Sequence, residues 1–134
     1  MVRWMSGTQK KMKKLLKIGK CIMYNIFDVI RVSFPFTDMA RSKTRPALVI
    51  SSYDFFGEKS GHSVAAMITS ATNSSFPLDT LVKEYKEAGL PKPCSVRMKL
   101  FTIDNRLVIE KVGQLSKNDR QKVKLSLKKL LELS

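Results

Sequence analysis

The sequence predicts a mainly β fold, in which a small, curved antiparallel sheet or open barrel carries one C-terminal helix. Short segments of alternating or β-branched residues follow one another along most of the chain, and polar loops separate them. Helices do not alternate with these segments, which argues against a parallel, doubly wound sheet. Apolar residues at helical spacing appear instead at the C-terminal end of the chain.

The strands are predicted from alternation and from β-branched residues. Residues 28–34 alternate apolar and polar side chains toward their end, which is typical of a strand with one buried face. Further strands are expected at 46–51, 63–68, 78–82, 95–100 and 108–114. Between them the sequence predicts a turn or short helix at 53–57, a polar loop at 70–77, an irregular segment at 83–93 and a tight turn or single helical turn beginning at 102.

Ser116 marks the start of the C-terminal helix, because its hydroxyl can accept a hydrogen bond from a backbone N–H of the first turn. Asp119 places a negative charge near the positive end of the helix dipole. The helix is expected to run to about Leu133. Its apolar stripe contains Val123, Leu127, Leu130 and Leu131.

The chain is strongly basic, with a net charge of +14 and a pI near 10. Half of this charge lies in residues 1–25, which hold seven cations and no acid, and the other half lies in residues 26–134. The body of the protein is therefore basic in its own right. This balance favours a polyanionic partner, which is a nucleic acid, an acidic protein or an anionic membrane surface.

Residues 26–134 are expected to form one domain, which is long enough to bury a core. For the basic tail, residues 1–25, we expect a weak helix, disorder or a start codon assigned too far upstream. The sequence contains no apolar run long enough for a membrane span and no signal-peptide core. Two cysteines and one histidine predict a reduced, cytoplasmic protein without a metal site or other cofactor.

A segment suited to phosphate binding joins the first two predicted strands. Residues 34–46 read Phe-Pro-Phe-Thr-Asp, then a polar loop, then Arg-Pro, and the loop with this Arg holds three cations, Arg41, Lys43 and Arg45. This order places Arg45 at the mouth of the sheet beside a basic loop. An arginine there can bind phosphate oxygens with its planar, two-pronged guanidinium.

Several motifs in this order resemble those of the MazF/PemK (Kid-like) toxins of bacterial toxin–antitoxin pairs. They are Phe-Pro-Phe-Thr-Asp at 34–38, Arg-Pro-Ala-Leu-Val at 45–49, Thr-Ser at 69–70, Gly-Leu-Pro-Lys-Pro at 89–93 and Val-Gly-Gln-Leu-Ser at 112–116. The resemblance covers roughly residues 26–133. It implies an SH3-like antiparallel barrel with a C-terminal helix, which acts as a homodimer.

The resemblance also implies a function and its partners. The protein is expected to be a toxin that cleaves single-stranded RNA, including mRNA, as a metal-independent endoribonuclease in the bacterial cytoplasm. A small acidic antitoxin is expected to silence it. The basic body suits both partners, because RNA and an acidic segment would seek the same groove.

Arg45 and Thr69 are the expected catalytic residues. Metal-free RNA cleavage needs a group that stabilises the charge of the phosphorane, and arginine suits this role. The family places an essential arginine at the Arg-Pro step and a catalytic threonine at the strand-end Thr-Ser. On spacing alone, Arg45 reads more readily as a surface charge at a strand entrance, and Thr69 reads as a β-branched residue that ends a strand.

The RNA-binding residues are expected to surround this pair. They are Arg97, Lys43, Ser70, Thr37, Arg41 and Lys99. Each cation has a competing interpretation as a solvated surface charge, and Phe36 reads as a core residue more readily than as a base-stacking one. The histidine and the aspartate that Kid-like members use are absent here, so the acid and the base of the reaction are unassigned.

A second class of function remains open. The same barrel can bind RNA or a protein target without cleaving it, as a gyrase-poisoning toxin with a related fold does. The combination of Arg45 and Thr69 favours the enzyme, because a binding module has no need of that pair.

Overall fold

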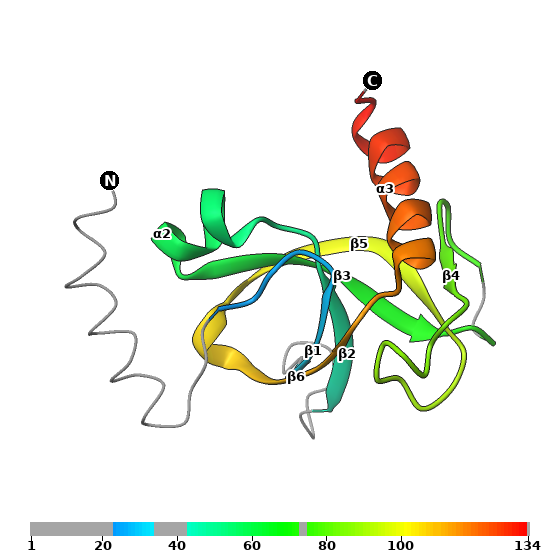
Figure 1. The fold of residues 1–134 in the computed structure, drawn as a ribbon, viewed down its shortest axis with the longest axis horizontal. Helices are drawn as coiled ribbons and strands as arrows, with labels where there is room; N and C mark the ends of the chain where they lie inside the picture. The colour runs from blue at the N-terminus through cyan, green and yellow to red at the C-terminus, as the bar shows by residue number, and fades with distance from the viewer. Residues whose placement is uncertain (1–22, 34–42, 73–74, 134) are drawn as a thin grey trace.

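A computed structural model of the chain describes residues 23–33, 43–72 and 75–133 (Figure 1). Its six strands form one curved, antiparallel sheet with the order β4-β5-β3-β2-β1-β6. The strands are β1 (Asp28–Ser33), β2 (Thr44–Val49), β3 (His62–Ser70), β4 (Thr80–Val82), β5 (Cys94–Asp104) and β6 (Val108–Gln114). Among the described strands, β4 and β6 are the edges of the sheet and do not pair, so the predicted barrel is an open one.

The strand boundaries depart from the prediction at three places. β2 begins at Thr44, so Arg45 lies within the strand. β4 is shorter than expected because Leu78 has a positive φ of 65°, which a strand does not accommodate. The turn predicted at 102 is wrong, because residues 102–104 pair with residues 62–64 of β3. The chain turns only afterwards, at the 3₁₀ helix η3 (Asn105–Leu107).

Helical structure is confirmed at 53–57 and after Ser116, although the first segment continues to Ser60 and the second ends at Leu131. A π-helical turn, η2 (Tyr53–Gly57), leads into the short helix α2 (Glu58–Ser60). The C-terminal helix α3 (Lys117–Leu131) begins after Ser116, whose Oγ accepts a hydrogen bond from the backbone N–H of Asp119 at 3.2 Å. The buried Asp119 carboxylate accepts two more, from the backbone N–H groups of Lys83 and Glu84, and so ties the helix start to the chain after β4.

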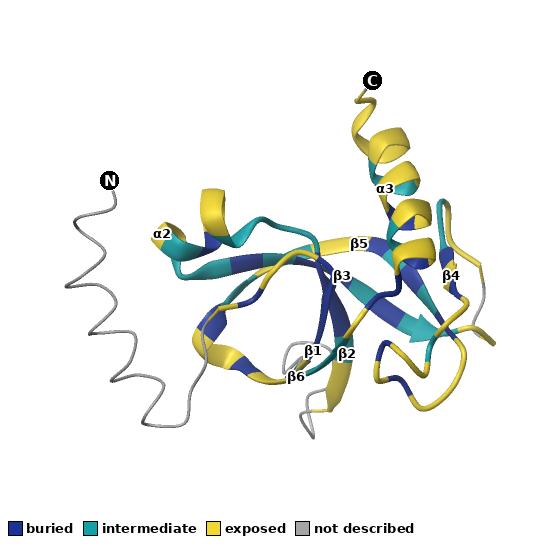
Figure 2. Ribbon diagram, in the orientation of Figure 1, coloured by how far each residue is buried: buried dark blue, intermediate teal, exposed yellow. Residues whose placement is uncertain are grey.

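Most of β1 and the end of β2 are buried (Figure 2). Alternation along these strands divides their buried residues between the two faces of the sheet. Val29 and Leu48, which oppose each other, belong to the cluster that α3 covers through Val123. Ile30 and Ala47, the next pair, belong to a second cluster with Tyr24 on the other face. A strand buried on both faces needs apolar residues at successive positions, as Val29 and Ile30 are.

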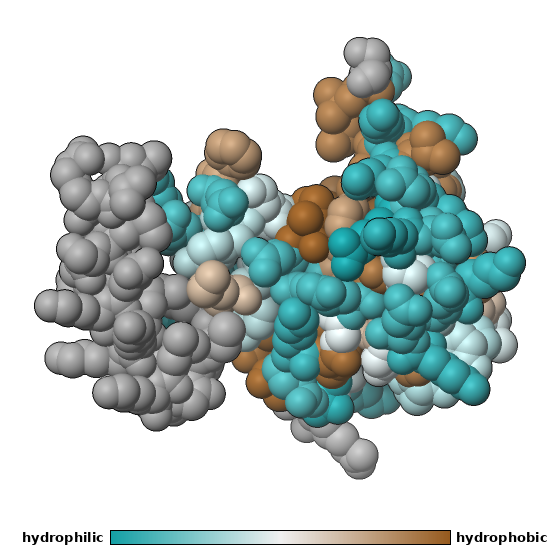
Figure 3. Space-filling model, in the orientation of Figure 1, coloured by the Kyte–Doolittle hydropathy of each residue, from teal (hydrophilic) through white to brown (hydrophobic). Residues whose placement is uncertain are grey.

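The end of α3 projects beyond the sheet (Figure 1). Val123 is buried and Leu127 is partly buried, but Leu130 and Leu131 are exposed although they belong to the predicted apolar stripe. Hydrophobic side chains are visible on this part of the molecular surface (Figure 3). The sheet is too short to cover the whole stripe.

Residues 1–22 of the predicted tail and Phe36 lie outside the described residues. Within the part that the structure describes, no helix is long and apolar enough to cross a membrane.

Candidate active site

A groove with a volume of about 510 Å³ opens where β2 begins and β3 ends. Each strand contributes three consecutive residues to its walls, so the groove lies across the point at which the two strands separate. The residues that line it are Thr44, Arg45 and Pro46 of β2, Ile68, Thr69 and Ser70 of β3, Gly89 to Lys92, Arg31, Cys94 and Val112.

The groove brings the two predicted catalytic residues together. The pairing of β2 with β3 ends at Ala47 and Met67. Arg45 and Thr69 each lie two residues beyond this last pair, where the strands separate, and both line the groove. Arg45 is exposed and Thr69 is partly exposed, so both can be reached from solvent.

The chain between β4 and β5 forms the opposite wall of the groove, and two glycines allow it to lie there. Gly89 has a φ of +80°, and a Cβ atom at this position would overlap the carbonyl of Val112 on β6. A Cβ atom at Gly113 would likewise come too close to the carbonyl of Ala88. The two backbones therefore touch directly, and this contact holds Pro91 and Lys92 at the rim.

The groove is cationic. Arg31, Arg45 and Lys92 line it, and Lys43 immediately precedes its first β2 residue. None of the described residues that line it is an aspartate or a glutamate. Such a surface attracts a phosphodiester.

Sequence reasoning missed Arg31. This residue lies on β1 opposite Pro46, and its Nη2 is 3.1 Å from Oε2 of Glu110 on β6. The signal was present, because Arg31 is a charged residue between the apolar residues Ile30 and Val32. Only the strand order reveals that it faces the groove.

Two smaller polar groups complete the groove. The hydroxyls of Ser70 and Thr72 are 3.0 Å apart and share a hydrogen bond. The Cys94 thiol is buried and donates to the carbonyl of Lys92 at 3.2 Å. Burial raises the pKa of this thiol, so it stays protonated and does not serve as a nucleophile.

Arg97 and Lys99 lie beside the groove but do not line it. Arg97 opposes Met67 on β3, which makes it a diagonal neighbour of Thr69. Its guanidinium is held by the Asp79 carboxylate through two hydrogen bonds, Nε to Oδ1 at 3.2 Å and Nη2 to Oδ2 at 3.0 Å. Arg97 and Lys99 also contact the ring of Phe76, at 5.3 and 5.2 Å from its centroid. Two other predicted RNA-binding residues, Thr37 and Arg41, lie outside the described residues.

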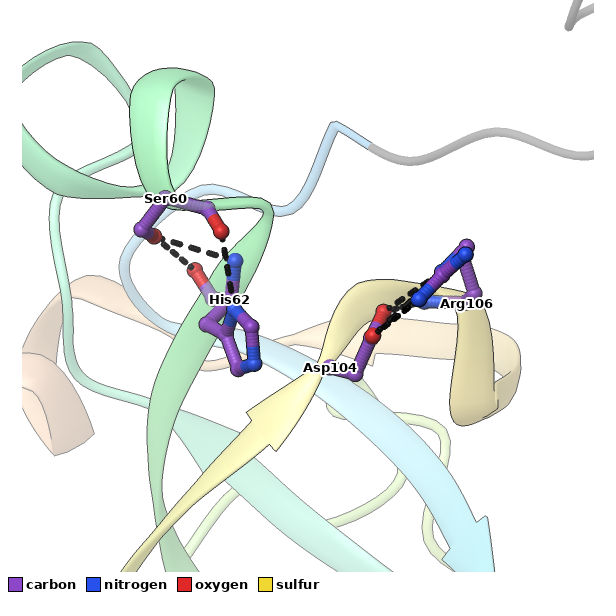
Figure 4. Close-up of polar contacts among 4 residues, drawn as sticks. All are labelled: Ser60, His62, Asp104 and Arg106. Carbon is purple, nitrogen blue, oxygen red and sulfur yellow. Dashed lines mark hydrogen bonds and ion pairs between the residues drawn. The ribbon is translucent and has the colours of Figure 1, made fainter.

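The polar groups at the far end of β3 form a separate cluster (Figure 4). The His62 ring donates from Nδ1 to the carbonyl of Ser60 at 2.8 Å. Arg106 donates to both oxygens of Asp104, and these hydrogen bonds hold the pKa of the Asp104 carboxyl far below its usual range. Seven residues separate His62 from Thr69 along the strand, or roughly 24 Å, so this cluster takes no part in the groove of the same chain. Among the described residues, no group of His, Cys, Asp and Glu side chains is arranged to hold a metal ion.

Comparisons with known proteins find matches among solved structures and among family models. A comparison with curated proteins finds no match. Among solved structures, a MazE–MazF complex from Deinococcus radiodurans (Form-III) has a TM-score of 0.67 at 20% identity, covering 84% of this chain and 99% of that one. Mycobacterium tuberculosis toxin MazF-mt6 has a TM-score of 0.62 at 16% identity, covering 80% and 98%.

An endoribonuclease solved with its cognate antitoxin from a mycobacterial species has a TM-score of 0.63 at 14% identity, covering 84% and 96%. At these identities the likeness establishes the fold. The family itself is established by sequence, because PemK-like, MazF-like toxins of type II toxin–antitoxin systems match residues 26–131. The chain therefore belongs to the PemK-like, MazF-like toxins of type II toxin–antitoxin systems.

Proposed function

We propose that this toxin is a metal-independent endoribonuclease that cleaves single-stranded RNA through its 2′-hydroxyl. RNA cleavage is the known role of the family. The observation that supports the proposal for this chain is the cationic groove into which neighbouring strands bring Arg45 and Thr69. A module that only binds RNA would need the cations but not this pairing of a guanidinium with a hydroxyl.

The reaction follows from what each group can do. The 2′-oxygen gives its proton to a water molecule and attacks the adjacent phosphorus. The bond from phosphorus to the 5′-oxygen breaks, and the departing oxygen takes a proton from water to become the 5′-hydroxyl. Arg45 would stabilise the extra negative charge of the phosphorane by donating two hydrogen bonds to its oxygens. Thr69 would hold the phosphate in line for attack through its hydroxyl. The products are a 2′,3′-cyclic phosphate, or the 3′-phosphate formed from it, and a 5′-hydroxyl.

The remaining predicted residues would bind the RNA on either side of the scissile phosphate. Ser70 lines the groove and Lys43 lies next to it, so both would contact the RNA backbone. Arg97 and Lys99 lie beside the groove and would contact the strand as it leaves. Thr37 and Arg41 would contribute from the segment that joins β1 to β2. No cofactor enters this mechanism.

Two protein partners follow from the family and from the surface. A small acidic antitoxin would bind the same cationic groove and exclude RNA, and the Deinococcus relative is itself solved as a MazE–MazF complex. A second copy of the chain would cover the exposed end of α3, where Leu125, Leu130 and Leu131 lie open to solvent. We place this homodimer in the bacterial cytoplasm.

One experiment separates the enzyme from the binding module. The purified protein is incubated with single-stranded RNA in excess EDTA, and the ends of the products are identified. The proposal predicts cleavage that yields 5′-hydroxyl ends, and no cleavage of a substrate with 2′-deoxyribose at the scissile position. Binding without cleavage would favour the non-catalytic function, and a strict requirement for Mg²⁺ would contradict the mechanism.

A further inference from the structure

We propose that Arg31 binds a second phosphate of the RNA in the groove, and that Glu110 competes with that phosphate and so limits the affinity of the toxin for RNA. This inference rests on the proposed function. It assigns Arg31 to RNA binding and Glu110 to weakening that binding. Neither residue belongs to the motifs that identify the family in this sequence.

The position of Arg31 in the sheet supports this role. β1 is the strand between β2 and β6, and Arg31 opposes Pro46 on one side and Glu110 on the other. Pro46 follows Arg45 directly, and both line the groove together with Arg31. By alternation Arg31 lies on the face of the sheet that carries Val29, whereas Arg45 lies on the face that carries Val32, and the groove at the ends of the strands is lined by both. A strand of RNA whose scissile phosphate lies at Arg45 would therefore pass Arg31 with another phosphate where it crosses this end of the sheet.

The burial of β1 singles out the same residue. Residues 28–30 and Val32 are buried and Ser33 is partly buried, so Arg31 is the one exposed residue of this strand. A charged side chain is accommodated there because the groove opens over it. Its long side chain is not needed to fill the core, and its guanidinium is free to change partner.

The ion pair of Arg31 with Glu110 is weak enough for a phosphate to replace the carboxylate. The two side chains are 45% and 50% exposed, and one nitrogen-to-oxygen distance of 3.1 Å joins them. Solvent weakens an exposed pair of this kind. A phosphodiester offers two oxygens to the same guanidinium, and it brings the rest of the polyanion toward Arg45 and Lys92. RNA would displace Glu110, at the cost of that ion pair and against the repulsion of the carboxylate.

A matched pair of variants tests this exchange. Glu110→Gln removes the carboxylate beside the groove, and Asp104→Asn removes the carboxylate that pairs with Arg106, away from the groove. Both substitutions raise the net charge by one and keep a polar side chain of the same size. The probe is a single-stranded 2′-O-methyl oligonucleotide, which the proposed chemistry does not cleave. Its affinity is measured by fluorescence anisotropy at several salt concentrations.

The expected result is specific to the groove. Glu110→Gln should bind the oligonucleotide about twofold to fivefold more tightly than the wild type, and clearly more tightly than Asp104→Asn. Arg31→Gln should bind about tenfold more weakly and should lower the slope of log affinity against log salt by about one. In the Arg31→Gln background, Glu110→Gln should increase the affinity for the oligonucleotide far less, because Arg31 is no longer there to be released from Glu110.

Three outcomes would overturn the inference. In the first, Glu110→Gln binds no more tightly than Asp104→Asn; in the second, its gain persists without Arg31; in the third, Arg31→Gln binds as the wild type does. Cleavage of unmodified RNA by the wild type, measured in parallel, keeps these results apart from the proposed function. If the wild type cleaves RNA and the variants bind alike, only the role of Arg31 is wrong. If the wild type neither binds nor cleaves RNA, both proposals fail.

Discussion

The two ends of β3 lie near arginines whose surroundings differ. At the end where Thr69 lies, Arg31, Arg45 and Lys92 surround a groove whose described lining residues include no carboxylate. At the beginning of the strand, Arg106 is bound by both oxygens of Asp104, with the shortest contact at 2.7 Å. The difference lies in the neighbours of each arginine, since both Arg45 and Arg106 are exposed.

The comparison shows what makes an arginine available to a ligand. Arg106 donates four hydrogen bonds to the Asp104 carboxylate, one from its backbone N–H and three from its guanidinium. Arg45 lies at the start of a strand whose neighbour diverges, so a ligand can approach it from the gap. Basic character alone would not distinguish the two ends, because residues 26–134 are basic as a whole.

The largest expected difference between the two ends is catalytic. Arg45→Ala should lower the rate of RNA cleavage by about 10²–10³, because a donor to the developing oxyanion is lost. Arg106→Ala, which removes the same charge at the other end, should change the rate by less than about threefold. Single-turnover cleavage of a short RNA measures both. Equal rates for Arg45→Ala and the wild type would remove Arg45 from the mechanism.

A smaller catalytic difference is expected for the hydroxyls. Thr69→Val keeps the shape of the side chain and removes its hydroxyl, and it should slow cleavage by about tenfold to a hundredfold because the phosphate is less well positioned. Thr102→Val makes the same change at an exposed position of β5 near the far end. It should leave the rate unchanged. Similar losses in the two variants would indicate a general effect of the substitution on the sheet.

Alanine substitutions of one glycine at each end should lower the free energy of unfolding by different amounts. Gly61 and Gly89 both have positive φ, but a Cβ atom at Gly61 would meet nothing within 4 Å, whereas one at Gly89 would overlap the Val112 carbonyl. Gly61→Ala should therefore cost about 1 kcal/mol of unfolding free energy, from backbone strain alone. Gly89→Ala should cost about 2–4 kcal/mol, because the groove wall must also move. Urea denaturation of both variants tests this, and equal losses would show that the close contact carries no weight.

The smallest effect is expected from removing residues 1–22. These residues hold seven of the chain's cations and lie outside the matched family region, which begins at residue 26. Their contribution to RNA affinity should be unspecific screening of phosphates. The truncated and full-length proteins should differ by a few-fold at low salt and converge near physiological salt, where the Debye length is ~8 Å. A truncated protein that is unfolded or inactive at every salt concentration would assign these residues to the domain.

Much of this fold follows from local signals in the sequence. The N-cap at Ser116 and the strand at 108–114 were predicted at their observed positions, because capping and alternation depend on neighbours in sequence. The length of β5 was not predictable in this way. Residues 102–104 stay extended because β3 offers them partners at 62–64, and this pairing is a long-range property.

The candidate site divides in the same way. Arg45 and Thr69 were predicted from motifs, and the register of β2 and β3 brings them to one groove. Arg31 was missed because the sequence predicts a strand with one solvent-exposed face, on which a charged residue is ordinary. Its place beside the groove depends on the strand order, which puts β1 between β2 and β6. Arg97 was predicted as a free RNA ligand, whereas its pairing with Asp79 depends on the fold around β4.

The most direct test of the central claim is a double-mutant cycle on Arg45 and Thr69, with the rate of RNA cleavage in EDTA as the readout. If the two residues act together on one phosphate, the double variant Arg45→Ala, Thr69→Val should be about as slow as Arg45→Ala alone, because the second loss removes nothing that still works. Rate losses that multiply would show that the residues act independently. An active double variant would show that the chemistry takes place elsewhere on the protein.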